Sequence, residues 1–150
     1  KGKGVDIIEI AMVDGDEDRE RIASMMESLS EQMELKFLLR DAINIRQCEL
    51  VIFIGTRSQP QGLDCGHCGF ATCAGRSKGV PCAINTIDCG IAIGSACATA
   101  ADLRVDSRVM FSAGLAAQRL GICGEGVEQV MAIAVSASSK SPFFDRKINK

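Results

Sequence analysis

Eight cysteines occur in this 150-residue chain, and four of them fall between residues 65 and 82. They are Cys65, Cys68, Cys73 and Cys82, with the spacing C-x2-C-x4-C-x8-C. Two cysteines separated by two residues can turn both sulfur atoms toward one point, and a third nearby cysteine adds another corner of a cuboid cluster. The fourth thiolate then comes from farther along the chain. This spacing predicts an iron–sulfur cluster, and therefore a redox protein rather than a hydrolase or a transferase.

Two glycines within the same segment, Gly66 and Gly69, serve the same chemistry. Glycine lets the backbone turn tightly and approach a cluster closely. Backbone N–H groups can then hydrogen-bond the cluster sulfurs and tune the reduction potential. We therefore expect Gly66 and Gly69 to contribute to cofactor binding. His67, the single histidine, lies between two predicted ligands; proton coupling is one role for it, and an exposed loop residue is the simpler interpretation.

Zinc is the rival metal, because it also binds four thiolates. Structural zinc sites more often combine two C-x2-C pairs separated by a longer loop, whereas this segment has one such pair. A thioredoxin-like dithiol would place its C-x2-C pair at a helix N-terminus after a strand, without further thiols. The crowding of four cysteines into one segment favours the iron–sulfur interpretation over both alternatives.

The cysteine segment also resembles known families. Residues 64–73, DCGHCGFATC, are similar to the signature of [4Fe–4S] modules in electron-transfer complexes and corrinoid–iron–sulfur proteins. Residues 79–96, 108–111 and 143–146 (GVPCAINTIDCGIAIGSA, RVMF and FFDR) resemble the uncharacterised family of ferredoxin-domain-containing proteins. The resemblance implies a [4Fe–4S] cluster and no particular reaction.

The fourth ligand is a choice between Cys82 and Cys89. The resemblance to electron-transfer modules selects Cys89, while the Gly-x-Pro-x-Cys arrangement of the ferredoxin-domain family selects Cys82. Pro81 restricts the backbone ahead of Cys82, and Cys82 falls where a helix is expected to begin. The N–H groups and dipole of a helix N-terminus would stabilise an anionic thiolate cluster there. Cys82 is therefore preferred, with Cys89 kept as the alternative.

Hydrophobic patterning predicts one α/β (α+β) domain spanning residues 1–150, with a central sheet flanked by helices. The cysteine-rich segment, residues 56–82, is expected to be a cluster-binding loop inserted before the central helix. A loop of this length within a compact domain is usually functional. Strands are expected at 5–13, 49–55 and 129–136, and helices at 16–33 (with Asp16 as N-cap) and 83–102. Residues 35–46 are expected to form one short helix or two fragments, and residues 105–120 a turn and a further helix with Asp106 or Ser107 as N-cap.

Each element has an expected environment. The strand at 49–55 should be central and covered on both faces, because its apolar run is continuous. The helix at 83–102 is expected to be buried, and its many small residues would permit close approach of another backbone or a flat ligand. The remaining thiols, Cys48, Cys97 and Cys123, are expected to be buried small hydrophobes. Asp88 lies inside the apolar helix and must find a partner or face a cavity.

The predicted order of elements also resembles, at the level of topology, the nitroreductase fold of flavin enzymes. That resemblance implies FMN as a second cofactor. The arginine-rich opening segment that would bind the flavin phosphate does not occur in this sequence, so the residues themselves give FMN little support.

Composition limits the partners. A net charge of −2 gives no indication of a nucleic-acid-binding face. The longest apolar stretch, 83–101, is interrupted by Asn85 and Asp88, which argues against a membrane span. The many cysteines and the absence of a visible signal peptide favour the reducing cytoplasm as the location of the protein. The sequence begins with Lys1, so a signal in a preceding segment stays an open question.

The expected function is electron transfer or a role as an oxidoreductase component. The expected partner is a redox protein or a small-molecule electron donor or acceptor, and a homodimer is left open. Two other functions fit the same cysteines: a zinc-binding structural or scaffold protein, and a sensor whose cluster or thiols respond to oxidant.

Overall fold

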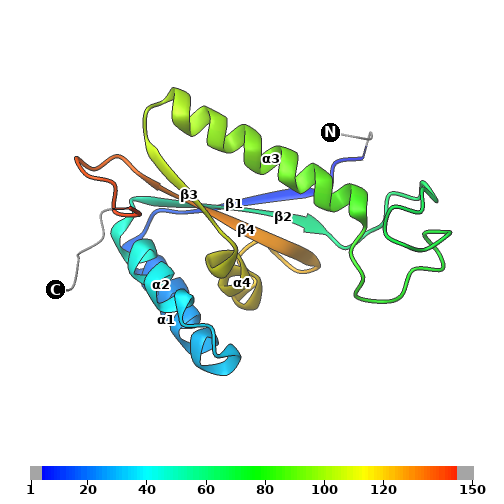
Figure 1. Cartoon of the computed structure of the whole chain (residues 1–150), viewed down its shortest axis with the longest axis horizontal. Coiled ribbons are helices and arrows are strands. Elements are labelled where there is room, and N and C mark those ends of the chain that lie inside the picture. Colours follow the sequence, from blue (N-terminus) through cyan, green and yellow to red (C-terminus); the bar gives the residue numbers. More distant parts are fainter. Residues whose placement is uncertain (1–4, 145–150) are drawn as a thin grey trace.

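A four-stranded antiparallel sheet with helices on both faces forms a single α+β domain, which confirms the predicted fold class (Figure 1). The computed structural model describes residues 5–144. The strands are β1 (Ile8–Val13), β2 (Leu50–Arg57), β3 (Asp106–Met110) and β4 (Val127–Ser136), in the spatial order β1-β2-β4-β3. The helices are α1 (Asp16–Met33), α2 (Phe37–Gln47), α3 (Ala83–Asp102) and α4 (Phe111–Leu120).

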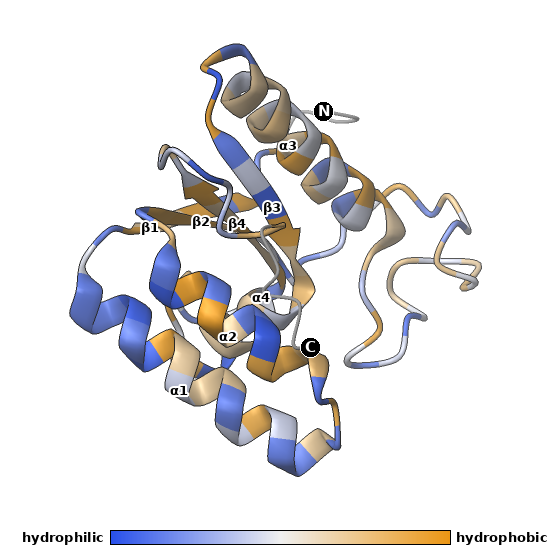
Figure 2. Cartoon of the chain, turned by 60° about the vertical axis from the view of Figure 1, so that its left-hand side comes forward, coloured by the Kyte–Doolittle hydropathy of each residue, from blue (hydrophilic) through white to orange (hydrophobic). Residues whose placement is uncertain are grey.

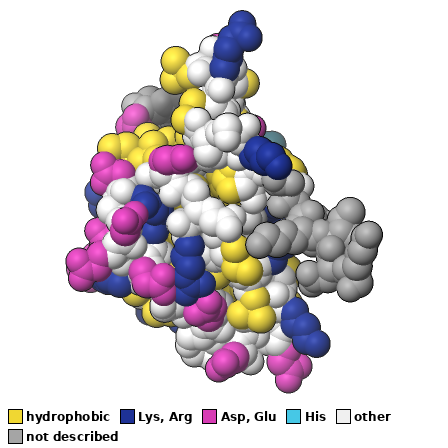
Figure 3. Space-filling view, turned by 90° about the vertical axis from the view of Figure 1, so that its left-hand side faces the viewer, with side chains coloured by type: hydrophobic (Ala, Val, Ile, Leu, Met, Phe, Trp, Pro, Cys, Tyr) yellow, Lys and Arg dark blue, Asp and Glu magenta, His cyan; other side chains and the backbone are white. Residues whose placement is uncertain are grey.

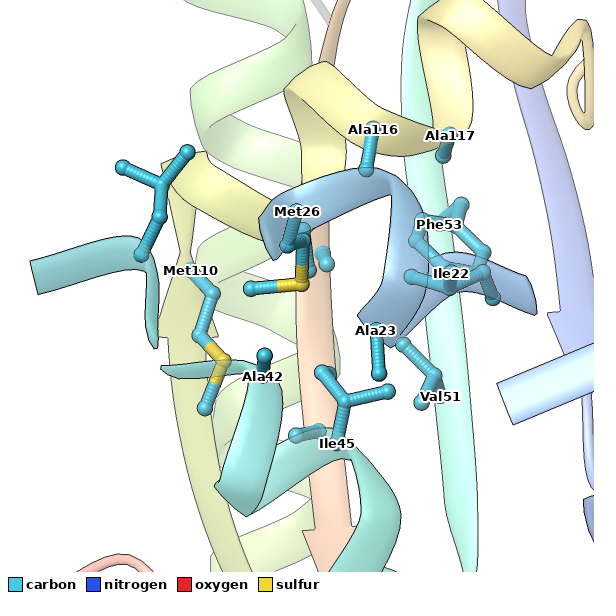
Figure 4. Packing of buried hydrophobic residues seen from close by; sticks show 14 of the residues in the cluster. Ile22, Ala23, Met26, Ala42, Ile45, Val51, Phe53, Met110, Ala116 and Ala117 are labelled. Atoms are coloured by element: carbon cyan, nitrogen blue, oxygen red, sulfur yellow. The ribbon is translucent and has the colours of Figure 1, made fainter. Parts of the chain in front are cut away.

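One face of the sheet is covered by α1, α2 and α4, and the main hydrophobic core lies between these helices and the strands (Figure 1, Figure 4). Ile22 and Met26 of α1 are fully buried there beside Ile45 of α2 and Phe53 of β2. The apolar residues of α1 recur at helical spacing, so one side of the helix meets the core while the other side carries charge. Hydrophilic residues accordingly colour the outer side of α1 (Figure 2), whereas α2 exposes the apolar side chains of Phe37, Leu39 and Ile43.

Helix α4 can approach the sheet closely because it carries Gly114. A Cβ atom at this position would lie 2.0 Å from the carbonyl oxygen of Val130 in β4. No side chain fits at that distance without moving backbone. Gly114 therefore fixes the separation between α4 and β4.

Among the described residues, α3 is the one helix that covers the opposite face of the sheet (Figure 1). A smaller apolar cluster, built on Ile54, Cys89 and Ile133, lies between this helix and the sheet. The expectation of a buried helix was wrong: four of the twenty residues of α3 are buried (Asn85, Asp88, Cys89 and Ala100). Apolar composition predicted burial, but residues 5–144 supply no second layer over α3. Within the described residues, α3 is long and apolar enough to cross a membrane, by length and composition only.

Three other boundaries differ from expectation. Residues 106–110 form the edge strand β3, not the start of a helix, so neither Asp106 nor Ser107 is a helix cap and β4 is the fourth strand. Gly15, not Asp16, occupies the N-cap position of α1. Strand β2 continues through Thr56 and Arg57, so the loop before α3 covers residues 58–82. The central position of β2 is confirmed, since it pairs with both β1 and β4.

Candidate metal centre

The cysteine loop, residues 58–82, leaves the end of β2 and projects beyond the sheet before it enters α3 (Figure 1). None of residues 58–81 is buried. The backbone–backbone hydrogen bonds within it are short-range turns, such as the one from the Gly69 N–H to the Gly66 oxygen at 2.9 Å. An ordered segment of this length normally needs an apolar core of its own or a metal. The loop has no such apolar core.

Both predicted glycines adopt backbone angles suited to glycine. Gly66 has a φ of 73° and Gly69 a φ of 87°, in the left-handed region. A Cβ added at either position would meet nothing within 4 Å. The two residues therefore turn the backbone around Cys68 and leave open space beside it, as the prediction of a cofactor in contact with the backbone requires.

The side chains of Asp64 and Arg76 form hydrogen bonds between different parts of the loop. Asp64 accepts a hydrogen bond from the Cys73 N–H at 2.6 Å, which ties the start of the cysteine motif to its third cysteine. The Arg76 guanidinium donates to the carbonyl oxygen of Val80 and, at 3.1 Å, to that of Ser58. The cation thereby joins the two ends of the loop close to the predicted ligand Cys82.

Asn85, in the first turn of α3, holds the base of the loop. Its side chain is fully buried and donates to the carbonyl oxygens of Arg57 at 3.2 Å and Gln59 at 2.7 Å. It also accepts a hydrogen bond from the Gln61 side chain at 3.0 Å. These bonds dock the first residues of the loop against the start of the helix. Sequence reasoning missed Asn85 as a site residue, and its only signal was a polar residue inside an apolar run.

The four predicted ligands differ in exposure. Cys65 is exposed, Cys68 and Cys73 are half-buried, and Cys82 is 7% exposed. Among the described residues, no three His, Cys, Asp or Glu side chains lie close enough together to hold a metal ion. The loop therefore gathers these cysteines at one end of the molecule without bringing their sulfur atoms into a coordination geometry.

Cys82 and Cys89 occupy different environments. Cys82 is the N-cap residue of α3. Burial acts to raise the pKa of its thiol, but the backbone N–H groups of Gln61, Asn85 and Ile84 and the Arg76 charge together act in the opposite direction, so the pKa lies below its usual value. Burial raises the pKa of Cys89, which packs against Ile54 and Ile133 on the sheet. Cys82 thus lies at the loop in surroundings that favour a thiolate, whereas Cys89 lies under the helix as a neutral thiol.

The other residues considered from the sequence take supporting positions. His67 is exposed, and its Nδ1 lies 3.1 Å from the Cys65 carbonyl oxygen. Asp88 is buried beside the sheet and lines a groove between α3 and β1. Cys48 is buried as expected, while Cys97 and Cys123 are only half-buried against the two apolar clusters.

Comparison with known proteins identifies the family. A family described as "uncharacterized protein containing a ferredoxin domain (DUF2148)" matches residues 78–146. An uncharacterized protein of Archaeoglobus fulgidus is 40% identical over 160 residues, an alignment that covers 100% of this chain and 85% of the relative. The chain belongs to this family. No solved structure matches it, and the topological resemblance to the nitroreductase fold stays a prediction.

Membership of a ferredoxin-domain family indicates an iron–sulfur protein. The thiols of the loop fit an iron–sulfur cluster, because four of them lie within one segment. Glycine turns separate the first three cysteines, and the fourth lies at a helix N-terminus. The region matched by the family contains Cys82 and Cys89 but begins after Cys73. The family match therefore does not include Cys65, Cys68 and Cys73, and metal binding by these residues is inferred from their spacing and chemistry.

Proposed function

We propose that this protein binds a [4Fe–4S] cluster through Cys65, Cys68, Cys73 and Cys82 and acts in electron transfer, as a carrier or as the electron-transferring part of an oxidoreductase. The observation that supports it best is the cysteine loop itself. Residues 58–81 contain no buried residue, yet polar side chains hold the loop at both ends. A cluster would supply the interior that the loop lacks.

Cys82 is the proposed fourth ligand because of its surroundings. A cluster with four thiolates is anionic, so it is stabilised by N–H groups and by nearby positive charge. Cys82 has both: the first N–H groups of α3 and the Arg76 guanidinium. Cys89 is two helical turns farther along, and its thiol contacts carbonyl oxygens of β2 and β4 at 3.8 and 3.9 Å. Ligation by Cys89 would require its thiol to give up both of these contacts.

When bound, such a cluster accepts and donates single electrons. The exposure of Cys65 places that edge of the site at the surface, where a redox protein can approach. Beside Cys68 lies a shallow apolar hollow of about 410 Å³, lined by Val80, Pro81 and Ile87 among others. Both features suit short-lived docking of an electron donor or acceptor rather than enclosure of a substrate.

A second hollow could bind a small-molecule electron acceptor. An apolar groove of about 440 Å³ lies between α3, α4 and β4, and Thr86 lines both this groove and the hollow beside Cys68. The groove lining contains no lysine or arginine. A phosphate-bearing flavin would find no cation there, so the lining favours an uncharged acceptor over FMN.

Metal analysis of the protein purified without oxygen tests this proposal. We expect about four iron and four sulfide per chain and a broad visible absorption band that dithionite bleaches. The band should return on reoxidation over repeated cycles without loss of iron, as electron transfer requires. Colourless protein with stoichiometric zinc would contradict the cluster. Release of iron at the first oxidation would contradict the electron-transfer role and support a sensor.

A further inference from the structure

The two faces of the sheet are covered unequally. Three helices cover one face, whereas α3 is the single described helix across the other (Figure 1). Large apolar side chains on the α3 side are consequently exposed. They are Ile10 (65%) and Met12 (65%) of β1, Val109 (41%) of β3, Ile87 (51%) and Ile91 (49%) of α3, and Leu103 (70%) just after it. We call these six residues, with the outer side of α3, the α3 face.

Strand register places the strand residues on this face. Ile10 pairs with Ile54, and Val109 pairs with Ile133. Ile54 and Ile133 both pack under α3. Since directly opposed residues in neighbouring strands point to the same side of a sheet, Ile10 and Val109 flank the helix on the same side. Figure 3 shows apolar side chains in the upper half of the molecule, toward α3, and also in the lower half, where most of the charged side chains lie.

The outer side of α3 carries small residues at positions where no contact with the described residues requires a small side chain. Gly90, Gly94 and Ala98 follow at intervals of four residues and are exposed. A Cβ at Gly90 or Gly94 would meet nothing within 4 Å. Each glycine inside a helix costs about 1 kcal/mol relative to alanine. Packing within this chain does not explain the two glycines, but close packing against another molecule would.

We infer that the α3 face is the interface of a homodimer, with α3 of a second copy packed antiparallel against it. The first argument is area. The six large side chains expose roughly 600 Å² before the small residues of the helix are added, close to the 800 Å² or so that each partner buries in a standard interface. This is also as large as the biggest apolar patches on typical monomers.

The second argument is charge. Asp88 and Asp102 are the only charged residues in α3, and Asp88 is buried. A membrane surface or an acidic partner would select basic residues around an apolar helix, and α3 itself has none. The six large side chains of the α3 face are all uncharged, so they meet their own copies without repulsion between like charges, as a two-fold interface requires. The carboxylates nearest to them, Asp6 and Asp88, lie in the groove between α3 and β1.

The third argument is shape. Grooves of about 440 Å³ and 350 Å³ flank α3 on its two sides, the second lined by Ile8, Ile10 and Ile91 among others. The low ridge between them lets the backbones of two helices approach, and the branched side chains of each copy can then enter the groove of about 350 Å³ in the other. Antiparallel helices would place the two cysteine loops at opposite ends of the dimer, about 30 Å or more apart for a twenty-residue helix. Each cluster would then act separately.

Light scattering and sedimentation equilibrium of the anaerobically purified full chain test the inference. We expect a mass of twice 15.9 kDa for the unaltered protein. Ile91→Glu should weaken the dimer at least about tenfold, since a buried charge without a partner is strongly unfavourable at an interface. Ile43→Glu is the matched control, because Ile43 is equally exposed (52%) but lies on α2; it should leave the mass unchanged.

Gly94→Leu separates dimerisation from folding. Leucine is a better helix former than glycine, so the variant should keep or raise the stability of the single chain, while its bulk should block helix contact and give a monomer. A mass of 15.9 kDa for the unaltered protein, at concentrations up to about 100 µM, would overturn the inference. So would a dimer that survives both Ile91→Glu and Gly94→Leu, or one that Ile43→Glu dissociates equally.

Discussion

The layer of α1, α2 and α4 and the cysteine loop lie in different parts of the same small domain. In the layer, side chains such as Ile22 and Phe53 are fully buried and Gly114 allows near contact of backbones. In the loop, residues 58–81 bury nothing, and a few polar side chains hold the segment at its ends. The comparison teaches that the layer is stabilised by its own packing, whereas the loop buries no residue, and we therefore expect it to depend on the proposed cluster. Four predictions, in order of decreasing effect, test that difference.

Substitution at Gly114 should have the largest effect on stability. Gly114→Ala places a methyl group against the Val130 carbonyl, so α4 must move away from the sheet. We expect the free energy of unfolding to fall by at least about 3 kcal/mol, measured by urea denaturation. Gly15→Ala is the control, because Gly15 has open space around its Cα and should change stability by about 1 kcal/mol or less. Equal effects would mean that the layer does not depend on this close contact.

Asn85→Ala should have an intermediate effect, and it should act on the loop more than on the layer. The substitution removes the bonds to the Arg57 and Gln59 carbonyl oxygens and one from Gln61. We expect a loss of about 2 kcal/mol in urea denaturation, together with a lower iron content after purification. The control is Gln61→Ala, which removes a single bond of the set and should cost about 0.5 kcal/mol. Full retention of iron in Asn85→Ala would contradict the role of Asn85 as the base of the loop.

Removal of the cluster should loosen the loop while the layer stays folded. Trypsin can cleave after Arg76 and Lys78 in the loop, and Arg21 in α1 offers an internal comparison. We expect chelation of the iron to raise the rate of cleavage at the two loop sites at least about tenfold, with Arg21 still protected by its helix. The urea midpoint of the layer should change little. Equal resistance of the loop with and without iron would show that the loop is ordered by its own contacts.

Acid should produce the smallest effect, and only in the layer. Hydrogen bonds from Arg46, followed by one from Ser24, lower the pKa of Glu20 from 4.5 to about 2. A carboxyl group with a lowered pKa stabilises the folded state above its ordinary pKa, and that contribution is lost as the pH falls from about 4.5 toward 2. The residue is at the surface, so the effect should be small and sensitive to salt.

Comparison of Glu20→Gln with the unaltered protein checks this prediction. The difference in Tm between the two proteins should be largest at neutral pH and should shrink as the pH approaches 2. A difference that stays constant across that range would contradict the pairing of Glu20 with Arg46.

Sequence predicted the layer and the position of the loop because these depend on local patterns. The spacing of Ile22, Met26 and Leu29 gave the core side of α1, and the run of glycine, serine, proline and cysteine gave the irregular segment before α3. The environments of Cys82 and Cys89 could not be read from spacing, since both cysteines lie near the start of one helix. They differ because one caps the helix and the other faces the sheet.

The incorrect predictions also have physical reasons. Strand β3 begins with Asp106, Ser107 and Arg108, polar residues that an edge strand tolerates and that resemble a helix start. Helix α3 was expected to be buried because its composition is apolar, yet composition does not say whether other elements of the same chain cover the helix. Asn85 was visible in the sequence only as a polar residue in an apolar run, and its role could not be predicted because its bonds join residues more than twenty positions apart.

The central claim is that the loop holds its cluster at the N-terminus of α3, and the most direct test compares the iron content of Cys82→Ser and Cys89→Ser after identical anaerobic purification. The two thiols are seven residues apart, and both are buried. We predict that Cys82→Ser loses most of its iron and its visible absorption, while Cys89→Ser keeps both. Loss of iron from Cys89→Ser with retention in Cys82→Ser would contradict this placement of the cluster.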